Sequence, residues 1–485
     1  MISFGFLMLA LILLIHGIYR ISLVFRLFLG SNAEKKKQED LLSTDSYPEV
    51  TIQLPIYNEK SVVERLLYAV CAIDYPKEKM EIQIIDDSTD ETTALVSGLV
   101  ADFKKKGFDI QHLQRGTRAG YKAGGLQYGL ERAKGEFIAI FDADFIPPPS
   151  FLKNTLPYFS SSKIGMVQAR WGYLNRDSNL LTRCQALFLD GHFLLEQPIR
   201  YKQNLFFNFN GTAGVWRKQC IIDAGGWEGD TLTEDLDLSY RAQFKGWKFV
   251  YTQKMVVPSE LPSPIVAFRT QQHRWAKGAI QTAKKHLLSL LRGSFPTTSK
   301  IEGLFHLLAH SIHPIVALLV ILNAVTFFSA PQEKSSVQVF AGILFSVISL
   351  FYISYLSVIL ILSKKFELST LFILPFSMAM ALGMTFANTK SVIDGLFGKN
   401  NIFVRTPKNG SYNPQKPIYK VEHSLTLPLL ETLAATVFSI ALYQAFQKHL
   451  WVSIPTLFLH TMGFGYVGIA TLYSIIKMKK IPSNH

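Results

Sequence analysis

The feature that most restricts the fold of this chain is a set of apolar segments, each long enough to cross a bilayer. The first covers Ile2 to Tyr19 and is followed by Arg20, Arg26 and three lysines at 35–37. A spanning helix needs about 20 apolar residues, and a cleaved signal peptide carries its positive charge before the apolar run, not after it. By the positive-inside rule, this segment predicts a membrane anchor whose following domain lies in the cytoplasm.

Four more spanning segments are expected toward the C-terminus. Short connectors within each pair predict two helical hairpins, over about 304–330 with 337–363, and 425–446 with 451–476. The whole chain is 48% hydrophobic and has a positive mean hydropathy. This composition fits a soluble domain joined to a small number of spanning helices.

A sixth apolar run, Leu371 to Ala387, does not fit this plan as a plain span. It contains Pro375 and continues into the polar sequence NTKSVIDG. If it crossed the membrane, the basic segment 399–424 would lie outside, against the positive-inside rule. We therefore interpret it as an interfacial or re-entrant helix, with a sixth spanning helix as the alternative.

The segment from Pro48 to about Thr252 has the pattern of a soluble α/β domain. Five short apolar runs predict strands, and helical patterns separate the first four of them. This alternation predicts a sheet with mostly parallel strands, which binds its ligand at their carboxyl ends. The strand-like runs are VTIQLPIYN, EIQIIDDS, DIQHLQR, EFIAIFDAD and GMVQARW.

Carboxylates follow two of these predicted strands. Asp142 and Asp144 end the fourth, and together they could bind Mg²⁺ or Mn²⁺ beside a diphosphate, although D-x-D triplets also occur by chance in loops. Asp86 and Asp87 end the second. They could accept hydrogen bonds from a nucleotide, and the alternative is an aspartate cap on the helix that begins near Asp90.

Three further motifs carry candidate polar groups. Lys122, in a glycine-rich stretch, could reach a diphosphate or belong to a solvated basic turn. Thr233 is expected to cap a helix that holds Glu234 and Asp235 in its first turn, where the dipole favours negative charge. An ionised carboxylate at that position is also a good general base for a hydroxyl nucleophile.

The sequence QQHRW precedes the long apolar region. Gln271 and Arg274 are three residues apart and share one face of a helix. Arg274 could contact a diphosphate while Trp275 stacks on a sugar ring. The alternative is a membrane-surface helix in which Trp275 is an interfacial anchor.

Taken in order, the four acidic and aromatic motifs resemble the D, DxD, TED and QxxRW series of processive family 2 glycosyltransferases, which include cellulose, mannan, chitin and hyaluronan synthases. The sequences VQARW, FNGTAGVWR and FRTQQHRW are most similar to the cellulose synthase-like branch that makes β-mannan or β-glucan. FVRTPK is similar to the gating loop of cellulose synthases. The motifs are Asp86-Asp87, Asp142-Ala143-Asp144, Thr233-Glu234-Asp235 and Gln271-x-x-Arg274-Trp275.

The resemblance implies a role for each matching residue. Asp235 is expected to be the general base, and Asp142 and Asp144 are expected to hold Mg²⁺ or Mn²⁺. The nucleotide sugar, a UDP- or GDP-hexose, is expected to contact Tyr57, Glu59, Asp86, Asp87, Lys122, Asp142, Gln271 and Arg274. The acceptor glycan is expected to contact Trp275, Glu234, Phe209 and Asn210, and the gating loop to act through Phe403, Thr406 and Lys408.

The resemblance also implies a GT-A fold, a Rossmann-like α/β domain, joined to an all-α transmembrane bundle. We expect a multi-pass protein of a bacterial inner or plasma membrane, with its catalytic domain in the cytoplasm. The expected units are the anchor (1–30), the GT-A domain (45–262), amphipathic helices with QxxRW (263–300), a hairpin (301–365), the re-entrant helix (366–398), the gating loop (399–424) and a second hairpin (425–478).

Three functions remain open at this point. The leading one is an inverting, processive synthase that polymerises glucose from UDP-glucose or mannose from GDP-mannose into a β-glycan and translocates it. The second is a transferase that adds one sugar to a lipid, and the third is a transporter with a nucleotide-binding regulator. The net charge of +14 suits a bilayer surface or a phosphate-bearing ligand, and no nucleic-acid-binding motif accompanies it. We make no prediction about protein partners.

Overall fold

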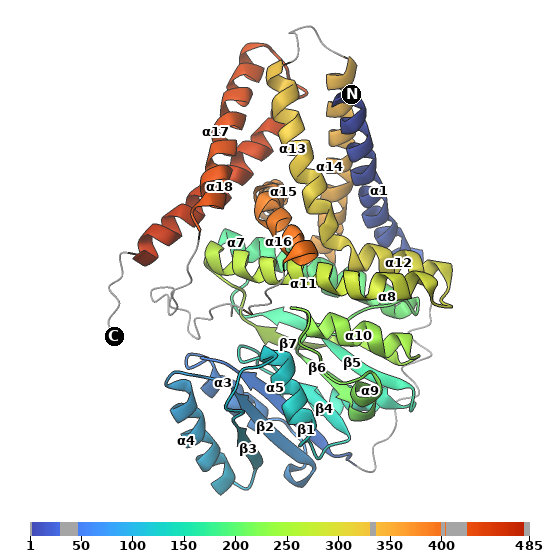
Figure 1. The fold of residues 1–485 in the computed structure, drawn as a ribbon, viewed down its shortest axis with the longest axis vertical. Helices are drawn as coiled ribbons and strands as arrows, with labels where there is room; N and C mark the ends of the chain where they lie inside the picture. The colour runs from blue at the N-terminus through green and yellow to red at the C-terminus, as the bar shows by residue number, and fades with distance from the viewer. Residues whose placement is uncertain (1, 30–46, 330–335, 399–402, 404–423, 480–485) are drawn as a thin grey trace.

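The protein has a soluble domain and a helical bundle, with a layer of nearly horizontal helices between them (Figure 1). The computed structural model describes residues 2–29, 47–329, 336–398, 403 and 424–479. The soluble domain is built on one sheet, and the two long helical hairpins and the N-terminal helix rise from the intermediate layer.

The sheet has seven strands in the order β3-β2-β1-β4-β6-β5-β7. The predicted, mostly parallel character is confirmed for β1 with β2 and β4, and for β2 with β3. Neither β6 nor β7 was predicted: the short β6 runs antiparallel to both β4 and β5, and β7 runs parallel to β5. The strands are β1 (Val50–Ile56), β2 (Met80–Asp86), β3 (Asp109–Leu113), β4 (Phe137–Ile140), β5 (Ile164–Tyr173), β6 (Gly214–Arg217) and β7 (Lys248–Ser259).

Helices cover both faces of the sheet, and its central strand β4 is apolar and buried on both sides. On one face, α3 and α4 pack their buried valines and leucines against β1 and β2. On the other face, α5, α9 and α10 pack against β4, β5 and β6. These helices are α3 (Val63–Cys71), α4 (Thr92–Lys105), α5 (Tyr121–Leu130), α9 (Lys218–Asp223) and α10 (Glu234–Phe244); α6 (Phe151–Thr155) and the short turns η1 (Lys77–Lys79) and η2 (Leu156–Phe159) complete the domain.

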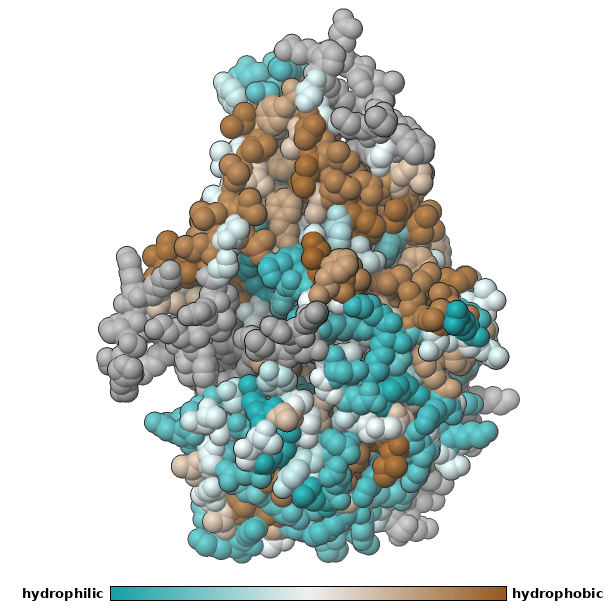
Figure 2. Space-filling model, in the orientation of Figure 1, coloured by the Kyte–Doolittle hydropathy of each residue, from teal (hydrophilic) through white to brown (hydrophobic). Residues whose placement is uncertain are grey.

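Within the described residues, five helices are long and apolar enough to span a bilayer, as predicted. Their apolar surfaces form the brown upper part of the molecule, whereas the soluble domain is largely hydrophilic (Figure 2). The first helix of the first hairpin, α13, begins later than predicted, because residues up to Leu307 belong to the preceding helix α12. The five are α1 (Ile2–Leu29), α13 (Ile312–Ser329), α14 (Ser336–Leu362), α17 (Thr426–Gln447) and α18 (Ile454–Lys479).

The sixth apolar run is broken in the structure. It forms α15 (Ile373–Gly383) and α16 (Thr385–Phe397), which meet at a bend of 45°. This pair is compatible with either a broken span or a re-entrant segment, and α16 packs along α11 (Figure 1). The short turns η4 (Ala309–Ser311) and η5 (Leu368–Phe372) precede α13 and α15.

The intermediate layer connects the sheet to the bundle. Its helix α11 carries the QQHRW motif and is tied to α17 by an ion pair in which Arg269 Nη1 lies 2.6 Å from Glu431 Oε2. The layer consists of α7 (Leu180–Asp190), the π-helical turn η3 (Gly191–Glu196), α8 (Gln197–Lys202), α11 (Ile265–Arg292) and α12 (Thr297–Leu307).

Candidate active site

A pocket of about 180 Å³ lies where the carboxyl ends of β1, β2 and β4 face helix α11. Most of the residues predicted for the site line it, although they come from widely separated parts of the chain. They are Tyr57, Glu59, Asp87, Lys122, Asp142, Asp144, Asn210, Glu234, Asp235, Gln271, Arg274, Trp275 and Phe403. We call this space the donor pocket.

Lys122 is the cation at the centre of the donor pocket. Its Nζ lies 2.5 Å from Asp142 Oδ1 and 3.9 Å from Glu234 Oε1, and it donates a hydrogen bond to the Gly211 carbonyl at 2.8 Å. Burial alone would lower the pKa of Lys122, but the charges of Asp142 and Glu234 outweigh burial and raise it. Lys122 is therefore positively charged at neutral pH.

Position 211 requires a glycine, because the side chains of Asp235 and Lys122 lie close to its backbone. Its φ of +80° favours glycine, and a Cβ at this position would lie 3.0 Å from Asp235 Oδ2 and 3.5 Å from Lys122 Nζ. A side chain here would push apart the base candidate and the lysine.

Asp142 and Asp144 provide carboxylate oxygens at the end of β4. Asp142 is partly exposed in the donor pocket, and Asp144 is buried and accepts a hydrogen bond from the Glu260 backbone N–H at 3.2 Å. Oxygen donors of this kind suit Mg²⁺ or Mn²⁺, so the donor set fits a divalent cation beside a diphosphate.

A second acidic cluster, Glu228, Asp230 and Asp237, has ligand atoms within 4.8 Å of one another. It does not line the donor pocket. Lys285 Nζ lies 2.5 to 2.9 Å from all three carboxylates, which neutralises part of their charge. We therefore assign this cluster a structural role.

Asp235 and Glu234 occupy the first turn of α10, as predicted. Thr233 stands at the N-cap position, but the prediction that its side chain caps the helix is wrong, because its Oγ1 lies 3.0 Å from Thr282 Oγ1 of α11 instead. Burial first, and then the charge of Glu234, raise the pKa of Asp235 to about 7, with Lys122 opposing them. The carboxylate predicted to be ionised at neutral pH is thus only partly ionised there.

The other end of the pocket carries the predicted nucleotide contacts. Arg115, which the sequence interpretation missed, forms a two-pronged ion pair with Asp87, and one of its bonds is 2.9 Å from Nε to Oδ1. The guanidinium carbon of Arg118 lies 3.4 Å from the centre of the Tyr57 ring. The sequence interpretation had noted Arg118 beside Lys122, and the R-x-x-R spacing before the glycine-rich helix start could have signalled Arg115 as well.

Asp86 is not among the residues that line the donor pocket. Its Oδ2 lies 2.9 Å from His112 Nε2, and its Oδ1 accepts a hydrogen bond from the Ser88 backbone N–H at 2.9 Å. Burial would raise the pKa of Asp86, but these hydrogen bonds outweigh burial and lower it. Asp86 thus stabilises the strand end, and a direct nucleotide contact from it is not supported.

Gln271, Arg274 and Trp275 lie on the face of α11 that covers the donor pocket. Arg274 lies over the Phe403 ring, with 4.5 Å between its guanidinium carbon and the ring centre, and the Tyr121 ring stacks on Phe403 at 6.0 Å. The other gating-loop residues that we predicted, Thr406 and Lys408, lie outside the described residues.

Phe209 is the second residue that the structure does not bring to the site. It is fully buried and packs against Trp216 and Trp227 in the core, where burial of its apolar ring is favourable. Its neighbour Asn210 lines the donor pocket.

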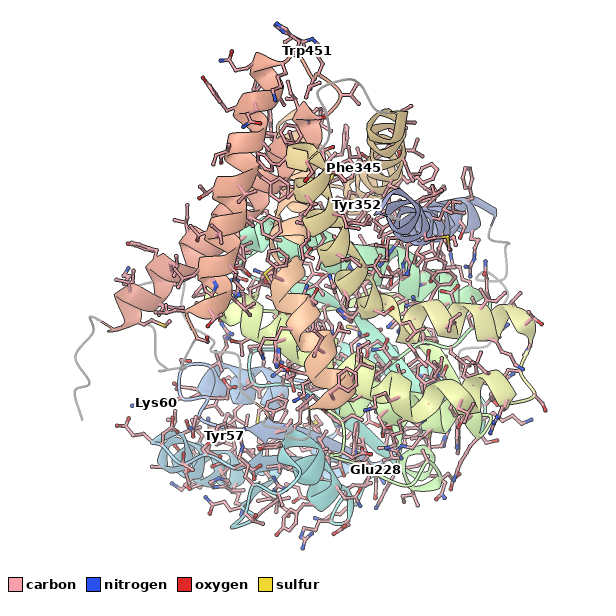
Figure 3. All side chains as sticks on the ribbon, turned by 45° about the horizontal axis from the view of Figure 1, so that its top comes forward. Tyr57, Lys60, Glu228, Phe345, Tyr352 and Trp451 are labelled. Carbon is pink, nitrogen blue, oxygen red and sulfur yellow. The ribbon has the colours of Figure 1, made fainter. Side chains whose placement is uncertain are left out.

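A much larger cavity, of about 1510 Å³, opens from the same place and extends into the bundle. Small-molecule sites are commonly about 300 to 1,000 Å³, so this space exceeds what one sugar needs. Asn210, Asp235 and Trp275 line both spaces. The cavity continues past Tyr352 and Phe345 to Trp451, at the end of the bundle farthest from the sheet (Figure 3). We call it the membrane cavity.

The sequence matches known proteins over most of its length. Residues 48–278 match the family described as "Glycosyltransferase like family 2". Curated relatives from Oryza sativa subsp. japonica include glucomannan 4-beta-mannosyltransferase 1, which is 43% identical over 53% of this chain and 51% of that protein. Probable glucomannan 4-beta-mannosyltransferase 4 is 35% identical over 81% of this chain and 70% of that protein. Glucomannan 4-beta-mannosyltransferase 2 of Arabidopsis thaliana is 42% identical over 52% of this chain and 48% of that protein.

This chain spans about half the length of several of these relatives. All three are plant proteins, so they do not support the expected bacterial membrane. Among solved structures, the mannosyltransferase PcManGT from Pyrobaculum calidifontis, in complex with GDP-Man and Mn²⁺, superposes with a TM-score of 0.57 at 17% identity, over 82% of this chain and 100% of that one. At this identity the likeness concerns the fold alone, and the predicted GT-A fold is confirmed.

Proposed function

The chain belongs to glycosyltransferase family 2, in its cellulose synthase-like branch, and on that premise we propose that it is an inverting, processive β-mannan synthase. It takes mannose from GDP-mannose and passes the growing glycan through the membrane cavity. The names of its relatives favour mannose over glucose. We further propose that the soluble domain lies in the cytoplasm, where basic segments flank the spans.

The observation that supports polymer synthesis most strongly is the continuity of the two spaces. The donor pocket and the membrane cavity share Asp235 and Trp275 as lining residues, and the cavity reaches Trp451. A transferase that adds one sugar to a lipid needs no such space through the bundle. Polar groups along it, such as Asn388 and His313, suit sugar hydroxyls better than an acyl chain.

The transfer can be described with the residues of this chain. Trp275 stacks on the terminal sugar of the glycan, and Asp235 in its ionised form accepts the proton from the attacking hydroxyl. The hydroxyl oxygen forms a bond to C1 of mannose while the bond from C1 to the diphosphate breaks on the opposite side, which inverts the anomeric centre. Lys122 and Arg274 bind the departing diphosphate.

The donor is bound from the other side of the pocket. The nucleoside is expected to contact Asp87 and Tyr57. Arg115 positions Asp87 through their ion pair, and the guanidinium of Arg118 lies over the Tyr57 ring. Asp142 and Asp144 would hold Mg²⁺ or Mn²⁺, which when bound stabilises negative charge on the diphosphate. The structural neighbour in complex with GDP-Man and Mn²⁺ supports this choice of ligand and ion by analogy of fold.

Product analysis tests the proposal. We expect the purified full chain in lipid nanodiscs to convert GDP-mannose into a long polymer that an endo-β-1,4-mannanase digests, and Asp235→Asn to make none while still binding GDP. A single labelled sugar on lipid would favour the second function. If a polymer formed only from UDP-glucose, the assignment as a polymerising glycosyltransferase would stand, but the assignment of mannose as the sugar would be wrong.

A further inference from the structure

Glu260 lines the donor pocket beside Asp142 and Asp144, and the transfer reaction described above uses no group of this residue. It follows the last residue of β7, shortly before α11 begins at Ile265. Glu260 therefore lies in the linker that joins the sheet to the helix carrying the QQHRW motif, and this linker meets the loop that carries the D-x-D triplet.

The end of β7 and the linker hold the D-x-D loop at two points. The Glu260 backbone N–H donates a hydrogen bond to Asp144 Oδ2 at 3.2 Å, and the Ile146 backbone N–H donates one to the Pro258 carbonyl at 2.9 Å. Asp144 is only 6% exposed, so its carboxylate is enclosed by protein. The hydrogen bond from Glu260 thus fixes one oxygen of the proposed ion ligand relative to β7.

Arg65 of α3 joins the same three parts through its guanidinium. Its Nη2 lies 2.8 Å from Glu260 Oε1 and 3.5 Å from the backbone carbonyl oxygen of Asp144. The Glu260 side chain is 12% exposed and that of Arg65 is 31% exposed. Exposed ion pairs contribute little, but a pair that is largely shielded from water is screened less. This pair therefore ties α3, the linker and the D-x-D loop together.

The rest of the linker is fixed by other side chains. The Leu261 backbone N–H donates to Asn175 Oδ1 at 2.8 Å, and Asn175 Nδ2 donates to the Leu261 carbonyl at 2.8 Å. Gln185 Nε2 donates to the Pro262 carbonyl, also at 2.8 Å. The peptide of Glu260 is thus the point at which an immobilised linker contacts the D-x-D loop.

We propose that Arg65 and Glu260 are positioning residues for the divalent cation. Their ion pair holds the Glu260 backbone N–H against Asp144, and so sets the orientation in which Asp144 meets the ion. Metal-ligating carboxylates are themselves hydrogen-bonded, and loss of such outer partners costs about 10- to 100-fold in metal affinity or activity. The inference rests on the proposed function, since it takes Asp144 as a ligand of Mg²⁺ or Mn²⁺.

Two other roles for Glu260 predict the opposite effect of one substitution. If Glu260 were itself an ion ligand, loss of Arg65 would release its carboxylate for the ion. If the pair acted only through its charges, loss of the arginine would strengthen the attraction for a cation. Both roles predict that Arg65→Gln binds Mn²⁺ more tightly, whereas a positioning role predicts that it binds Mn²⁺ more weakly.

Mn²⁺ binding tests the inference without sugar transfer. The purified full chain in nanodiscs, saturated with GDP, is titrated with Mn²⁺, and the electron paramagnetic resonance signal of the free ion gives the Kd. We expect Arg65→Gln to raise this Kd about tenfold. The double variant Arg65→Gln with Glu260→Gln leaves the net charge unchanged and should raise the Kd by a similar factor, because two residues in contact that act as a unit are not additive.

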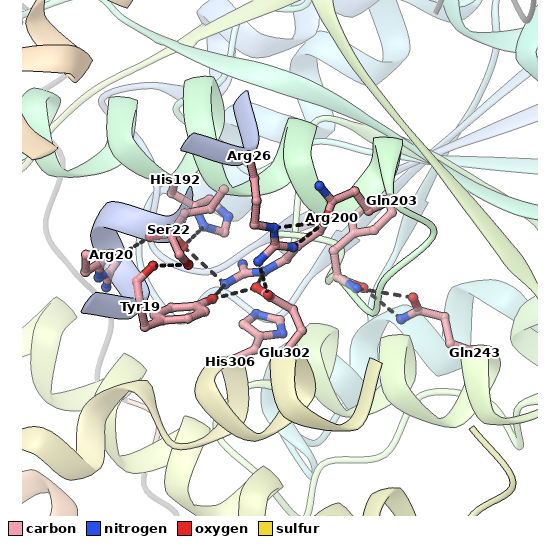
Figure 4. Close-up of polar contacts among 12 residues, drawn as sticks. Tyr19, Arg20, Ser22, Arg26, His192, Arg200, Gln203, Gln243, Glu302 and His306 are labelled. Carbon is pink, nitrogen blue, oxygen red and sulfur yellow. Dashed lines mark hydrogen bonds and ion pairs between the residues drawn. The ribbon is translucent and has the colours of Figure 1, made fainter. Parts of the chain in front are cut away.

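Arg26→Gln is the matched control and should keep the wild-type Kd. Arg26 Nη1 lies 2.8 Å from Glu302 Oε2 in a partly buried pair that does not line the donor pocket (Figure 4). Asp144→Asn locates the ion and should raise the Kd at least as much as Arg65→Gln. GDP binding in EDTA shows that each variant still has a folded pocket.

The inference is overturned if Arg65→Gln binds Mn²⁺ as tightly as wild type or more tightly, if the double variant keeps the wild-type Kd, or if Arg26→Gln loses as much affinity. Loss of GDP binding in EDTA along with Mn²⁺ binding also counts against it, since the pair would then support the whole pocket. If Asp144→Asn leaves the Kd unchanged, the inference fails with the ion site. Failure of the proposed function differs, because Mn²⁺ binding then changes as expected but no nucleotide sugar yields a polymer.

Discussion

Lys122 Nζ lies 2.5 Å from Asp142 Oδ1, so one ammonium neutralises a carboxylate that would otherwise repel a sugar diphosphate. Glu234 shares the same cation at 3.9 Å. Lys122 is therefore a fixed positive charge among the acidic groups of the donor pocket.

Lys122→Met should weaken donor binding. The change removes a charge-assisted contact worth about 1.5 to 3 kcal/mol, which corresponds to an increase of about 10- to 100-fold in the Kd for GDP and in the KM for the nucleotide sugar. Titration calorimetry and initial rates measure these quantities. Lys134→Met is the control, since Lys134 forms an exposed pair with Asp109 far from the pocket. An unchanged donor KM in Lys122→Met would contradict the assignment.

The rate of transfer should rise with pH through about 7. The pKa of Asp235 is raised to about 7, and only the ionised form can accept a proton, so activity is present above that pKa and is lost as pH falls below it. We expect kcat to fall about tenfold per pH unit on the acid side and to level off near pH 8. In Lys122→Met, loss of the opposing positive charge should move the midpoint upward. A profile that declines as pH rises through 7 would refute the base assignment.

The sequence predicted the acids of the site well, because parallel strands end at one edge of a sheet. Asp87, Asp142 and Asp144 follow different strands and meet there. Helical spacing likewise placed Gln271 and Arg274 on the same face of α11. In each case, local geometry alone determines the direction of the side chain.

Two predicted site residues lie outside the donor pocket, because the direction of their side chains depends on distant neighbours. Asp86 and Asp87 are adjacent at a strand end, so their side chains point to opposite sides, and His112 of β3 pairs with the first. The side chains of Phe209 and Asn210 also point in different directions: Phe209 lies in the core, and Asn210 lines the donor pocket. Arg115 was missed because its partner, Asp87, is 28 residues away.

Trp275→Ala should shorten the product and weaken glycan binding. Trp275 lines both the donor pocket and the membrane cavity, where the end of the glycan is expected. The ring supplies an aromatic face worth about 0.5 to 1.5 kcal/mol beyond its buried area, so we expect a loss of about 2- to 12-fold in acceptor affinity. Trp275→Phe keeps an aromatic face and should retain most of the product length, as gel filtration would show. If Trp275→Phe lost as much product length and acceptor affinity as Trp275→Ala, Trp275 would have a structural role and would not bind the glycan.

Metal removal should abolish transfer, and the ion should act at Asp142 and Asp144. We expect EDTA to stop activity and Mn²⁺ or Mg²⁺ to restore it, with Asp144→Asn requiring a much higher ion concentration for half-maximal rate because a neutral amide is a weaker ligand than a carboxylate. Asp230→Asn is the discriminating control, because Asp230 belongs to the other acidic cluster, which Lys285 already neutralises. If Asp230→Asn raised the ion requirement and Asp144→Asn did not, the ion would belong to that cluster, and the D-x-D assignment would be wrong.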